Sequence, residues 1–268
     1  WAELVSHRQR EKKLNRSEPW WSDRRQDLIQ LASNQSPLYV YDEKRLRGAA
    51  GELLSLHAID RINYAVKANP HPEILKLFAN LNLSFDCVSI GEIHHLKRTL
   101  PNLPNDRIVF TPNFAPIDEY LSAFAMGCHV TLDNATLLEN HPEVFRGQSF
   151  FLRLDPNILA GHHRHVQTSG TQSKFGLSRE QLTSCARSVH QLNAKVIGLH
   201  AHVGSGIDSP STWANSALFL AEIAQNFPDV SILDLGGGFG VPDKPEQPRI
   251  DLEAVQESLD HVRRLYPQ

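Results

Sequence analysis

One lysine, Lys67, follows an apolar segment in a setting that favours chemistry at its amine. Residues 62–66 form the apolar run, small Ala65 and Ala68 flank the lysine, and Asn69 and Pro70 follow. Ligands of parallel α/β folds bind at the carboxyl ends of the strands, where a lysine between apolar neighbours would be partly desolvated. An uncharged amine there could bond to an aldehyde. Taken alone, a lysine at a strand end is more often a solvated residue at the rim of a sheet.

A glycine-rich turn follows the last predicted strand and could bind an anion. Residues 234–240 read Asp-Leu-Gly-Gly-Gly-Phe-Gly, and glycines allow the backbone amides to approach phosphate oxygens closely. The pattern departs from the dinucleotide fingerprint and from the GxxxxGK[ST] loop, so it does not indicate nucleotide binding. The alternative is a tight turn without a ligand.

Two histidines precede a second glycine turn. His200 and His202 are two residues apart and therefore lie on the same side of a strand. Gly204, Ser205 and Gly206 follow, and the Ser205 hydroxyl and amide could donate to phosphate. A hydrogen-bonded pair of histidines is the alternative, and a metal site would need a third ligand.

An alternating series of strands and helices must position these residues. After Pro37, short runs rich in β-branched and aromatic residues alternate with amphipathic segments, a pattern that predicts a parallel sheet. Strands are predicted over residues 38–41, 62–68, 84–88, 107–111, 129–132, 149–154, 195–203 and 231–235. Helices are predicted over residues 43–57, 72–79, 90–98, 117–126, 178–191, 212–226 and 252–265, with Ser178 and Asp251 as capping residues.

The remaining segments are a charged N-terminal stretch and one long connection. Residues 1–36 carry no strand signal and are predicted to be a linker or accessory segment, with residues 37–268 forming the main domain. Residues 155–178 are polar and longer than packing requires, so they are a candidate lid. The cluster Gly161-His162-His163-Arg164-His165 lies within this connection. It is expected to be solvated or to face the substrate, and no metal is expected.

Composition limits the classes of partner. The net charge of -3 and the pI near 6.6 give no basic excess for nucleic acid or anionic lipid. The three cysteines, Cys87, Cys128 and Cys185, are widely spaced and favour a reducing compartment. No apolar run approaches the ~20 residues that a membrane-spanning helix needs, and no signal-peptide pattern is present. We therefore expect a cytoplasmic protein that acts on a small molecule.

Five motifs occur in the order found in the fold-type III pyridoxal-phosphate-dependent decarboxylases, and from about residue 37 to residue 240 the chain resembles this family. The motifs are residues 64–69 (Tyr-Ala-Val-Lys-Ala-Asn), 85–89 (Phe-Asp-Cys-Val-Ser), 173–176 (Ser-Lys-Phe-Gly), 200–205 (His-Ala-His-Val-Gly-Ser) and 234–240. Together they are more specific than any one of them. The resemblance implies pyridoxal 5'-phosphate as the cofactor and an alanine racemase-like, TIM-type (β/α)8 barrel as the fold.

The resemblance also implies a role for each matching residue. Lys67 is expected to bond to the cofactor aldehyde and to move protons, and His202 is expected to lie against the pyridine ring; these two are the expected catalytic residues. The expected cofactor-binding residues are Lys67, Asp86, Arg153, His202, Ser205, Gly236, Gly237 and Gly238. Glu92 is similar to a second acidic residue near Lys67. For Asp86, Glu92 and Arg153, a buried ion-pair network is the alternative role.

Within the family, one segment favours a substrate. Residues 168–176 resemble the diaminopimelate-type Thr-Gly-x-x-x-Ser-Lys-Phe-Gly stretch more than the ornithine-type loop, although Ser169 is inserted between Thr168 and Gly170. This implies a carboxy-lyase that converts meso-2,6-diaminopimelate to L-lysine and CO2, the last step of lysine biosynthesis. An ornithine- or arginine-type decarboxylase, a non-catalytic pyridoxal-phosphate-binding barrel and a phosphate-binding barrel without pyridoxal chemistry remain the alternatives.

The family pattern also implies how much of the fold this chain carries. In the family the counterpart of residues 38–41 belongs to the C-terminal β domain, and the barrel begins at Ile62. Seven barrel strands are then predicted here, with the eighth strand and the β domain lying outside the chain. We expect little or no decarboxylase activity from this chain alone, a homodimer for the full-length protein, and an upstream junction before Trp1, as in fusions with an aspartate kinase.

Overall fold

The computed structural model describes residues 19–156, 175–242, 244 and 247–266, and the chain divides into two compact units. Unit 1 comprises Trp1–Ala49 and Pro242–Pro248, and unit 2 comprises Ala50–Val241 and Arg249–Gln268. Every residue of the predicted site lies in unit 2. The predicted division into residues 1–36 and 37–268 stays a prediction.

Unit 1 is built from short helices without a buried core in its described part. It contains η1 (Ser22–Arg24) and α2 (Arg25–Asn34), neither of which has a buried residue, and α3 (Glu43–Leu54) begins in it. The strand predicted over residues 38–41 is not formed, so that prediction is wrong. The side chains of these four residues are exposed, and none of the described strands pairs with the segment. An apolar run becomes a strand only where a neighbour accepts its backbone hydrogen bonds.

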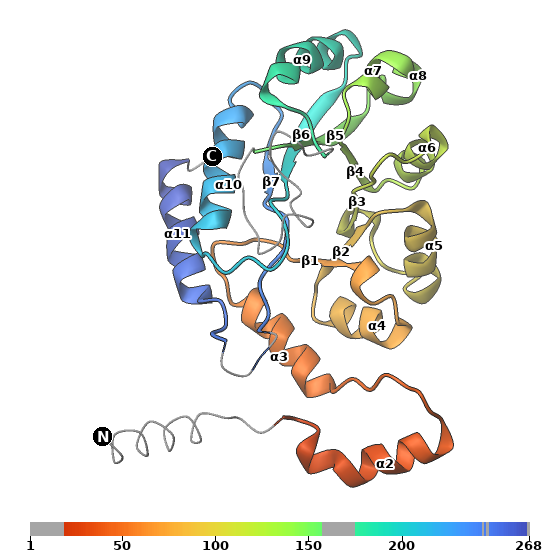
Figure 1. Cartoon of the computed structure of the whole chain (residues 1–268). Coiled ribbons are helices and arrows are strands. Elements are labelled where there is room, and N and C mark those ends of the chain that lie inside the picture. Colours follow the sequence, from red (N-terminus) through yellow and green to blue (C-terminus); the bar gives the residue numbers. More distant parts are fainter. Residues whose placement is uncertain (1–18, 157–174, 243, 245–246, 267–268) are drawn as a thin grey trace, which may run out of the picture. The chain divides into compact units, whose positions relative to one another are not determined.

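Unit 2 contains a seven-stranded sheet in which neighbouring strands are parallel and follow chain order. The strands are β1 (Asn63–Ala65), β2 (Ser84–Cys87), β3 (Ile108–Phe110), β4 (His129–Leu132), β5 (Ser149–Leu154), β6 (Lys195–Ala201) and β7 (Ile232–Asp234). Figure 1 shows that the sheet curves and that helices lie along its outer side. The predicted barrel-type α/β fold is confirmed, because each strand predicted after Tyr41 is present in this partial barrel.

The helices of unit 2 follow the strands in chain order, and α11 comes after the last described strand. They are α4 (Pro72–Asn80), α5 (Ile90–Thr99), α6 (Ile117–Ala125), α7 (Thr136–Asn140), α8 (Pro142–Phe145), α9 (Leu182–Gln191), α10 (Ser211–Ala224) and α11 (Leu252–Leu265). Helices α7 and α8 were not predicted, because five and four residues are too few to show a helical period. In the described ranges no helix is both long and apolar enough to cross a membrane.

Polar side chains fix where several helices begin. The Ser89 hydroxyl accepts from the Glu92 amide at the start of α5, and the Asp251 carboxylate accepts from the Ala254 amide at the start of α11. Ser178 forms a capping box with Gln181 around η5 (Arg179–Gln181), which leads into α9. The predicted caps Ser178 and Asp251 are therefore confirmed. Each cap satisfies backbone amides that the first turn of a helix leaves without a partner.

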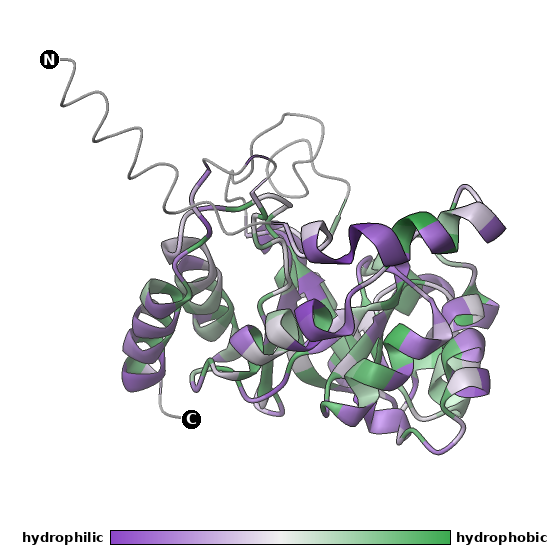
Figure 2. Ribbon diagram, turned by 90° about the horizontal axis from the view of Figure 1, so that it is seen from below, coloured by the Kyte–Doolittle hydropathy of each residue, from purple (hydrophilic) through white to green (hydrophobic). Residues whose placement is uncertain are grey.

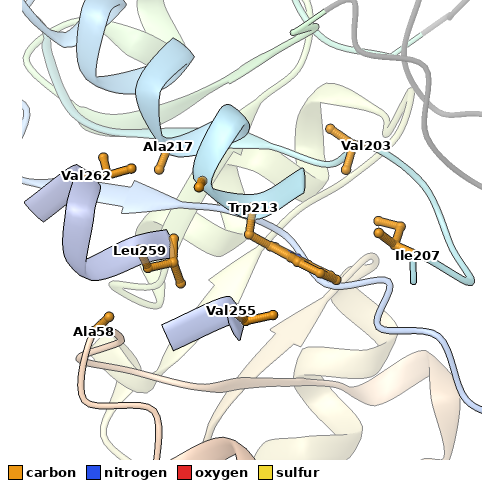
Figure 3. Close-up of a cluster of buried hydrophobic side chains, with 9 residues drawn as sticks. Ala58, Val203, Ile207, Trp213, Ala217, Val255, Leu259 and Val262 are labelled. Carbon is orange, nitrogen blue, oxygen red and sulfur yellow. The ribbon is translucent and has the colours of Figure 1, made fainter. Parts of the chain in front are cut away.

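The core of unit 2 is formed where apolar strands meet the inner faces of the helices. All residues of β3 are buried, as are the last five of β5. Figure 2 shows hydrophobic and hydrophilic residues on different sides of the helices, as expected for helices that cover a sheet. Beside β6 and β7, α10 and α11 enclose a cluster that we call the α10–α11 cluster (Figure 3). Its members are Ala58, Val203, Ile207, Trp213, Ala214, Ala217, Val255, Leu259 and Val262.

Candidate active site

Lys67 lies in a turn just beyond the carboxyl end of β1. The strand ends at Ala65, and η2 (Val66–Ala68) carries the lysine past the edge of the sheet. The Tyr64 hydroxyl donates to the Asn69 carbonyl oxygen at 3.3 Å and so closes this turn. The strand predicted over residues 62–68 is therefore shorter than expected. The lysine side chain is exposed, so the partial burial that we predicted for its amine is wrong.

The charge of Lys67 nevertheless acts on the predicted site. It favours the ionised carboxylate of Asp86 and lowers the pKa values of His200 and His202. These three residues come from β2, from β6 and from the turn after β6. The structure therefore brings Lys67, Asp86 and His202 into one electrostatic environment at the carboxyl edge of the sheet.

Strand register aligns three polar side chains across the sheet. Arg153 on β5 pairs with His200 on β6, which pairs with Asp234 on β7. Residues paired in parallel strands direct their side chains to the same face. Arg153 is 7% exposed and His200 is 6% exposed, so these two side chains are buried, whereas Asp234 is partly exposed.

Arg153 is a buried cation surrounded by acidic groups. Burial lowers the pKa of its guanidinium, and the carboxylates of Asp133, Asp86, Asp234 and Asp155 raise it again. The acidic groups thus act electrostatically on Arg153, whereas no salt bridge of its guanidinium is found among the described residues, so its predicted role and the alternative ion-pair network both stay predictions.

Asp86 is held by a hydroxyl from the neighbouring strand. The Thr111 hydroxyl donates a hydrogen bond to Asp86 Oδ1. Burial is the main cause that raises the pKa of Asp86 to about 6; the Thr111 hydrogen bond and the charges of Lys67 and Arg153 oppose this rise, and Asp234 adds to it. A carboxyl group with such a pKa can hold or release a proton near neutral pH.

The two histidines differ in their surroundings. Burial and the charges of Arg153 and Lys67 lower the pKa of His200 well below its usual range. Its Nδ1 has no hydrogen-bond partner in the part of the chain that the structure describes. Burial is also the main cause that lowers the pKa of His202 to about 4, so this imidazole is neutral near pH 7. The hydrogen-bonded pair that we gave as an alternative is thus not supported at His200 Nδ1.

Two glycine turns abut at the ends of β6 and β7. The Ile207 amide donates to the Gly238 carbonyl at 2.8 Å, and the Gly240 amide donates to the Ile207 carbonyl at 2.8 Å. Gly238 has a φ of +91°, and a Cβ on it would lie 2.0 Å from the Gly204 carbonyl oxygen. Only glycine allows these two turns to approach so closely.

The glycines of the second turn do not contribute in the same way. The Gly236 amide donates to Asp234 Oδ1 at 2.9 Å, so Gly236 shapes the turn and binds its own strand end. Among the described residues no protein oxygen accepts from the amides of Gly237 or Gly238. Ser205, in the first turn, is exposed. The two amides and the serine hydroxyl are therefore the groups that could donate to an anion.

The end of the long connection packs back onto β5. The Leu177 amide donates to the Arg153 carbonyl at 2.8 Å, and the Asp155 amide donates to the Leu177 carbonyl at 3.0 Å. The Arg153 guanidinium lies 4.7 Å from the centre of the Phe175 ring. The expected lid and the His162–His165 cluster lie outside the described residues, apart from the ends of the connection. In the ranges that are described, no three His, Cys, Asp or Glu side chains group as metal ligands.

Glu92 has a local structural role. Its Oε2 accepts from the Val88 amide at 2.8 Å, and its own amide donates to the Ser89 hydroxyl. Both contacts lie within the turn that links β2 to α5. No contact with the cofactor is needed to explain this glutamate.

Sequence reasoning assigned no role to four polar residues of the site, although it named Asp234 as the start of the glycine motif. Thr111 and Asp133 follow the buried strands β3 and β4, and Asp234 ends β7, whose other two residues are exposed. Tyr120 on α6 donates to Asp133 Oδ1 at 3.5 Å. Burial raises the pKa values of Asp133 and Asp234. The signal that could have found the first three is their position, since polar residues that directly follow apolar strands face the ligand edge of a parallel sheet. Tyr120 carries no such signal.

Comparison with known proteins found a matching family model and similar relatives. The model of the family "Pyridoxal-dependent decarboxylase, pyridoxal binding domain" matches residues 47–267. The diaminopimelate decarboxylase of Methanothermobacter thermautotrophicus is 30% identical over 244 residues, which cover 87% of this chain and 56% of that protein. The chain thus spans little more than half the length of this relative.

Solved structures share the fold. The diaminopimelate decarboxylase of Helicobacter pylori complexed with L-lysine superposes with a TM-score of 0.78 at 24% identity, covering 89% of this chain and 62% of that one. The arginine decarboxylase of Paramecium bursaria Chlorella virus superposes with a TM-score of 0.72 at 22% identity, covering 90% and 64%. The shared fold alone does not separate the two substrates.

Proposed function

Because this chain belongs to the pyridoxal-dependent decarboxylase family and contains its pyridoxal-binding domain, we propose that Lys67 is the residue that bonds to pyridoxal 5'-phosphate. We further propose that the chain is the cofactor-binding portion of a diaminopimelate decarboxylase, which releases CO2 from meso-2,6-diaminopimelate and forms L-lysine. One observation carries the assignment of Lys67: it lies two residues after Ala65, which pairs with Asp86 on β2, at the carboxyl edge of the sheet where the glycine turns abut.

The residues at this edge fit the cofactor. An aldehyde needs an amine, and Lys67 is an exposed one. A phosphate group needs donors that approach closely, and the amides of Gly237 and Gly238 belong to residues that carry no side chain of their own. A flat aromatic ring needs an uncharged neighbour, which the imidazole of His202 provides. The buried and unpartnered Nδ1 of His200 marks further hydrogen-bonding capacity at the same edge.

The protein would orient the reactants and move protons. When bound, pyridoxal 5'-phosphate supplies a conjugated ring that accepts the electron pair left by departing CO2. Lys67 would hold the aldehyde until the substrate amine displaces it, and its Nζ would then carry a proton to the reacting carbon. Asp86 would hold a proton beside Lys67, because its pKa lies near 6.

Two groups would fix the position of the ring. His202 would pack against one face of the ring as a neutral imidazole, which avoids burying a second charge. Arg153 would contact a cofactor oxygen, and its acidic neighbours hold the guanidinium at the carboxyl edge. Ser205, Gly237 and Gly238 would donate to the phosphate group, with Gly236 shaping their turn.

Similarity to a named relative supports the substrate. The Methanothermobacter protein is a diaminopimelate decarboxylase, and residues 168–176 resemble the diaminopimelate-type segment. We also propose a homodimer in the cytoplasm, and an amino acid rather than nucleic acid as the partner, from the family resemblance and the chain's weak net charge.

Covalent trapping tests the cofactor assignment. Pyridoxal 5'-phosphate added to the chain is expected to produce visible absorbance, and borohydride reduction followed by peptide mapping is expected to find the modification on Lys67. Lys67→Ala should abolish it. Lys76→Ala is the matched control, because Lys76 is an exposed lysine that pairs with Glu73 on α4 and should not affect trapping. Modification of any other lysine would refute the assignment.

A panel of substrates tests the proposed reaction. CO2 release is measured with meso-diaminopimelate, ornithine or arginine as the substrate. The assay is run on residues 1–268 and, where the gene encodes a longer protein, on that full-length protein. We expect turnover of diaminopimelate by the full-length protein and little or none by residues 1–268. Faster turnover of ornithine or arginine would contradict the proposed substrate.

A further inference from the structure

Trp213 is a fully packed aromatic residue that connects the helical core of unit 2 to the second glycine turn. It lies in the first turn of α10 and is 2% exposed. Figure 3 shows its ring extending from α10 between Val255 of α11 and Ile207. The tryptophan therefore reaches from a helix that contacts α11 to the segment that follows β6.

Two contacts join Trp213 to residues of the glycine turn. Its Nε1 donates to the Gly237 carbonyl oxygen at 3.3 Å. Its ring stacks on Phe239, with ring centres 4.2 Å apart and planes 14° apart. Stacking on Phe239 fixes the orientation of the indole ring. Its Nε1 can then hold the carbonyl group of Gly237 in one orientation.

Fixing the Gly237 carbonyl also fixes the next amide. A trans peptide group is planar, so its C=O and N–H point in opposite directions. The carbonyl of Gly237 points to Trp213, and the amide of Gly238 therefore points away from the helical core. That amide donates to no protein oxygen among the described residues.

From this geometry we infer that Trp213 is a positioning residue for anion binding, which aims the Gly238 amide at the phosphate group of the cofactor. The inference rests on the proposed function, because it assigns the phosphate to this turn. Glycine has the greatest backbone freedom of all residues, so three successive glycines without an anchor would sample many orientations. The two backbone hydrogen bonds of Ile207, with Gly238 and Gly240, restrain the turn on one side. Trp213 restrains the peptide group between Gly237 and Gly238, which those two bonds do not involve.

The test compares pyridoxal 5'-phosphate with pyridoxal, which has the same aldehyde but no phosphate. Trp213→Phe keeps an aromatic ring against Phe239 and removes the Nε1 donor. Losing one hydrogen bond that aims a donor is expected to weaken binding of pyridoxal 5'-phosphate by about three- to tenfold. Binding of pyridoxal should not change. Both affinities are read from titrations of the absorbance of the lysine-bound form.

A core substitution that keeps the Trp213 Nε1 donor in place is the matched control. Leu259→Val removes a methylene group from the α10–α11 cluster, so it should lower thermal stability and leave the ratio of the two affinities unchanged. If Trp213→Phe does not fold, Phe239→Leu is the second variant, because it removes the ring on which Trp213 stacks. It is expected to lower the affinity for pyridoxal 5'-phosphate relative to the affinity for pyridoxal.

Each result has one reading. A selective loss for pyridoxal 5'-phosphate supports the role of Trp213, whereas equal losses for both compounds, or no loss, overturn it. If the parent chain attaches the cofactor at Lys67 and the ratio is unaltered in the variant, this inference alone fails. If the parent chain attaches no cofactor at Lys67, the proposed function fails and the inference fails with it.

Discussion

Asp86 is a partly buried carboxyl group whose pKa lies close to neutral pH. Its pKa of about 6 results mainly from burial, which the hydrogen bond from Thr111 and the charges of Lys67 and Arg153 only partly offset. At neutral pH the folded protein therefore holds a carboxylate at a free-energy cost. Such a cost is expected where a group serves chemistry more than stability.

Replacing Asp86 with asparagine should stabilise the protein at neutral pH. The pKa of the folded state lies above the usual value of 3.8, so the folded protein binds more protons than the unfolded chain between pH 3.8 and about 6. Stability from this group therefore falls as pH rises through that window. Asp86→Asn should gain on the order of 2–3 kcal/mol above pH 6 and little below pH 4. Urea unfolding at pH 4, 5 and 7 measures this.

The control for this prediction is a carboxylate without burial. Asp251 caps α11 at an exposed position, and Asp251→Asn should show no comparable gain with pH. A gain for Asp86→Asn that stays constant from pH 4 to pH 7 would contradict the raised pKa.

The sequence predicted which residues gather at the site better than it predicted which side chains surround each of them. The motifs placed Lys67, Asp86 and His202 at strand ends, and the structure puts them at one edge of the sheet. Their environments depend on residues far away in the chain. Thr111 reaches Asp86 from β3's end, and Asp133 reaches Arg153 from β4's end. Such pairings follow from register, which local sequence does not contain.

Among the elements, long periodic segments were predicted well and strand ends were not. The bounds of β4, β5 and α11 agree with prediction, because each is a sustained apolar pattern with clear breaks. The end of β1 was missed, since residues 66–68 continue an apolar run while turning into η2. Whether a run stays extended depends on its neighbour: Ala65 pairs with Asp86, and no later residue of that run pairs with β2.

The glycine turn offers a test at the level of one element. Gly238→Ala would place a methyl group 2.0 Å from the Gly204 carbonyl oxygen, in a backbone region that alanine rarely adopts. We expect a loss of about 2–4 kcal/mol in the free energy of unfolding, together with lost cofactor binding.

Gly237→Ala is the neighbouring control for this change. A Cβ at that position meets no atom within 4 Å, and its φ is not positive. The variant should unfold within about 1 kcal/mol of the parent, because glycine-to-alanine changes at unstrained positions have small effects. Thermal or urea unfolding of the two variants checks this. Equal losses of unfolding free energy would show that the contact with the Gly204 carbonyl oxygen does not account for the cost of Gly238→Ala.

In the part of the chain that the structure describes, the hydrophobic core lies in unit 2. The buried hydrophobic residues extend from Ala50 to Val262, whereas the described part of α2 and η1 contributes none. Stability that is measured for the whole chain should therefore report on unit 2.

Paired substitutions can test this division of stability. Ile29 and Leu31 on α2 are exposed, so alanine at either position should change the free energy of unfolding by less than about 0.5 kcal/mol. Leu259→Ala in the α10–α11 cluster should cost about 2–5 kcal/mol. Urea unfolding under one set of conditions compares them. A loss of more than about 1 kcal/mol at Ile29 or Leu31 would mean that α2 is packed in solution.

The pairing of Arg153 with His200, and of His200 with Asp234, restricts how this chain can change in length. One extra residue after Gly198, with the upstream pairing kept, would place Leu199 opposite Arg153. His200 would move to the opposite face, among the helices. The polar row would lose its central histidine, and an apolar side chain would lie opposite Arg153. Insertions and deletions in related genes should therefore fall in the connections between strands, and a library of single-codon insertions should yield no cofactor-binding variants within β6.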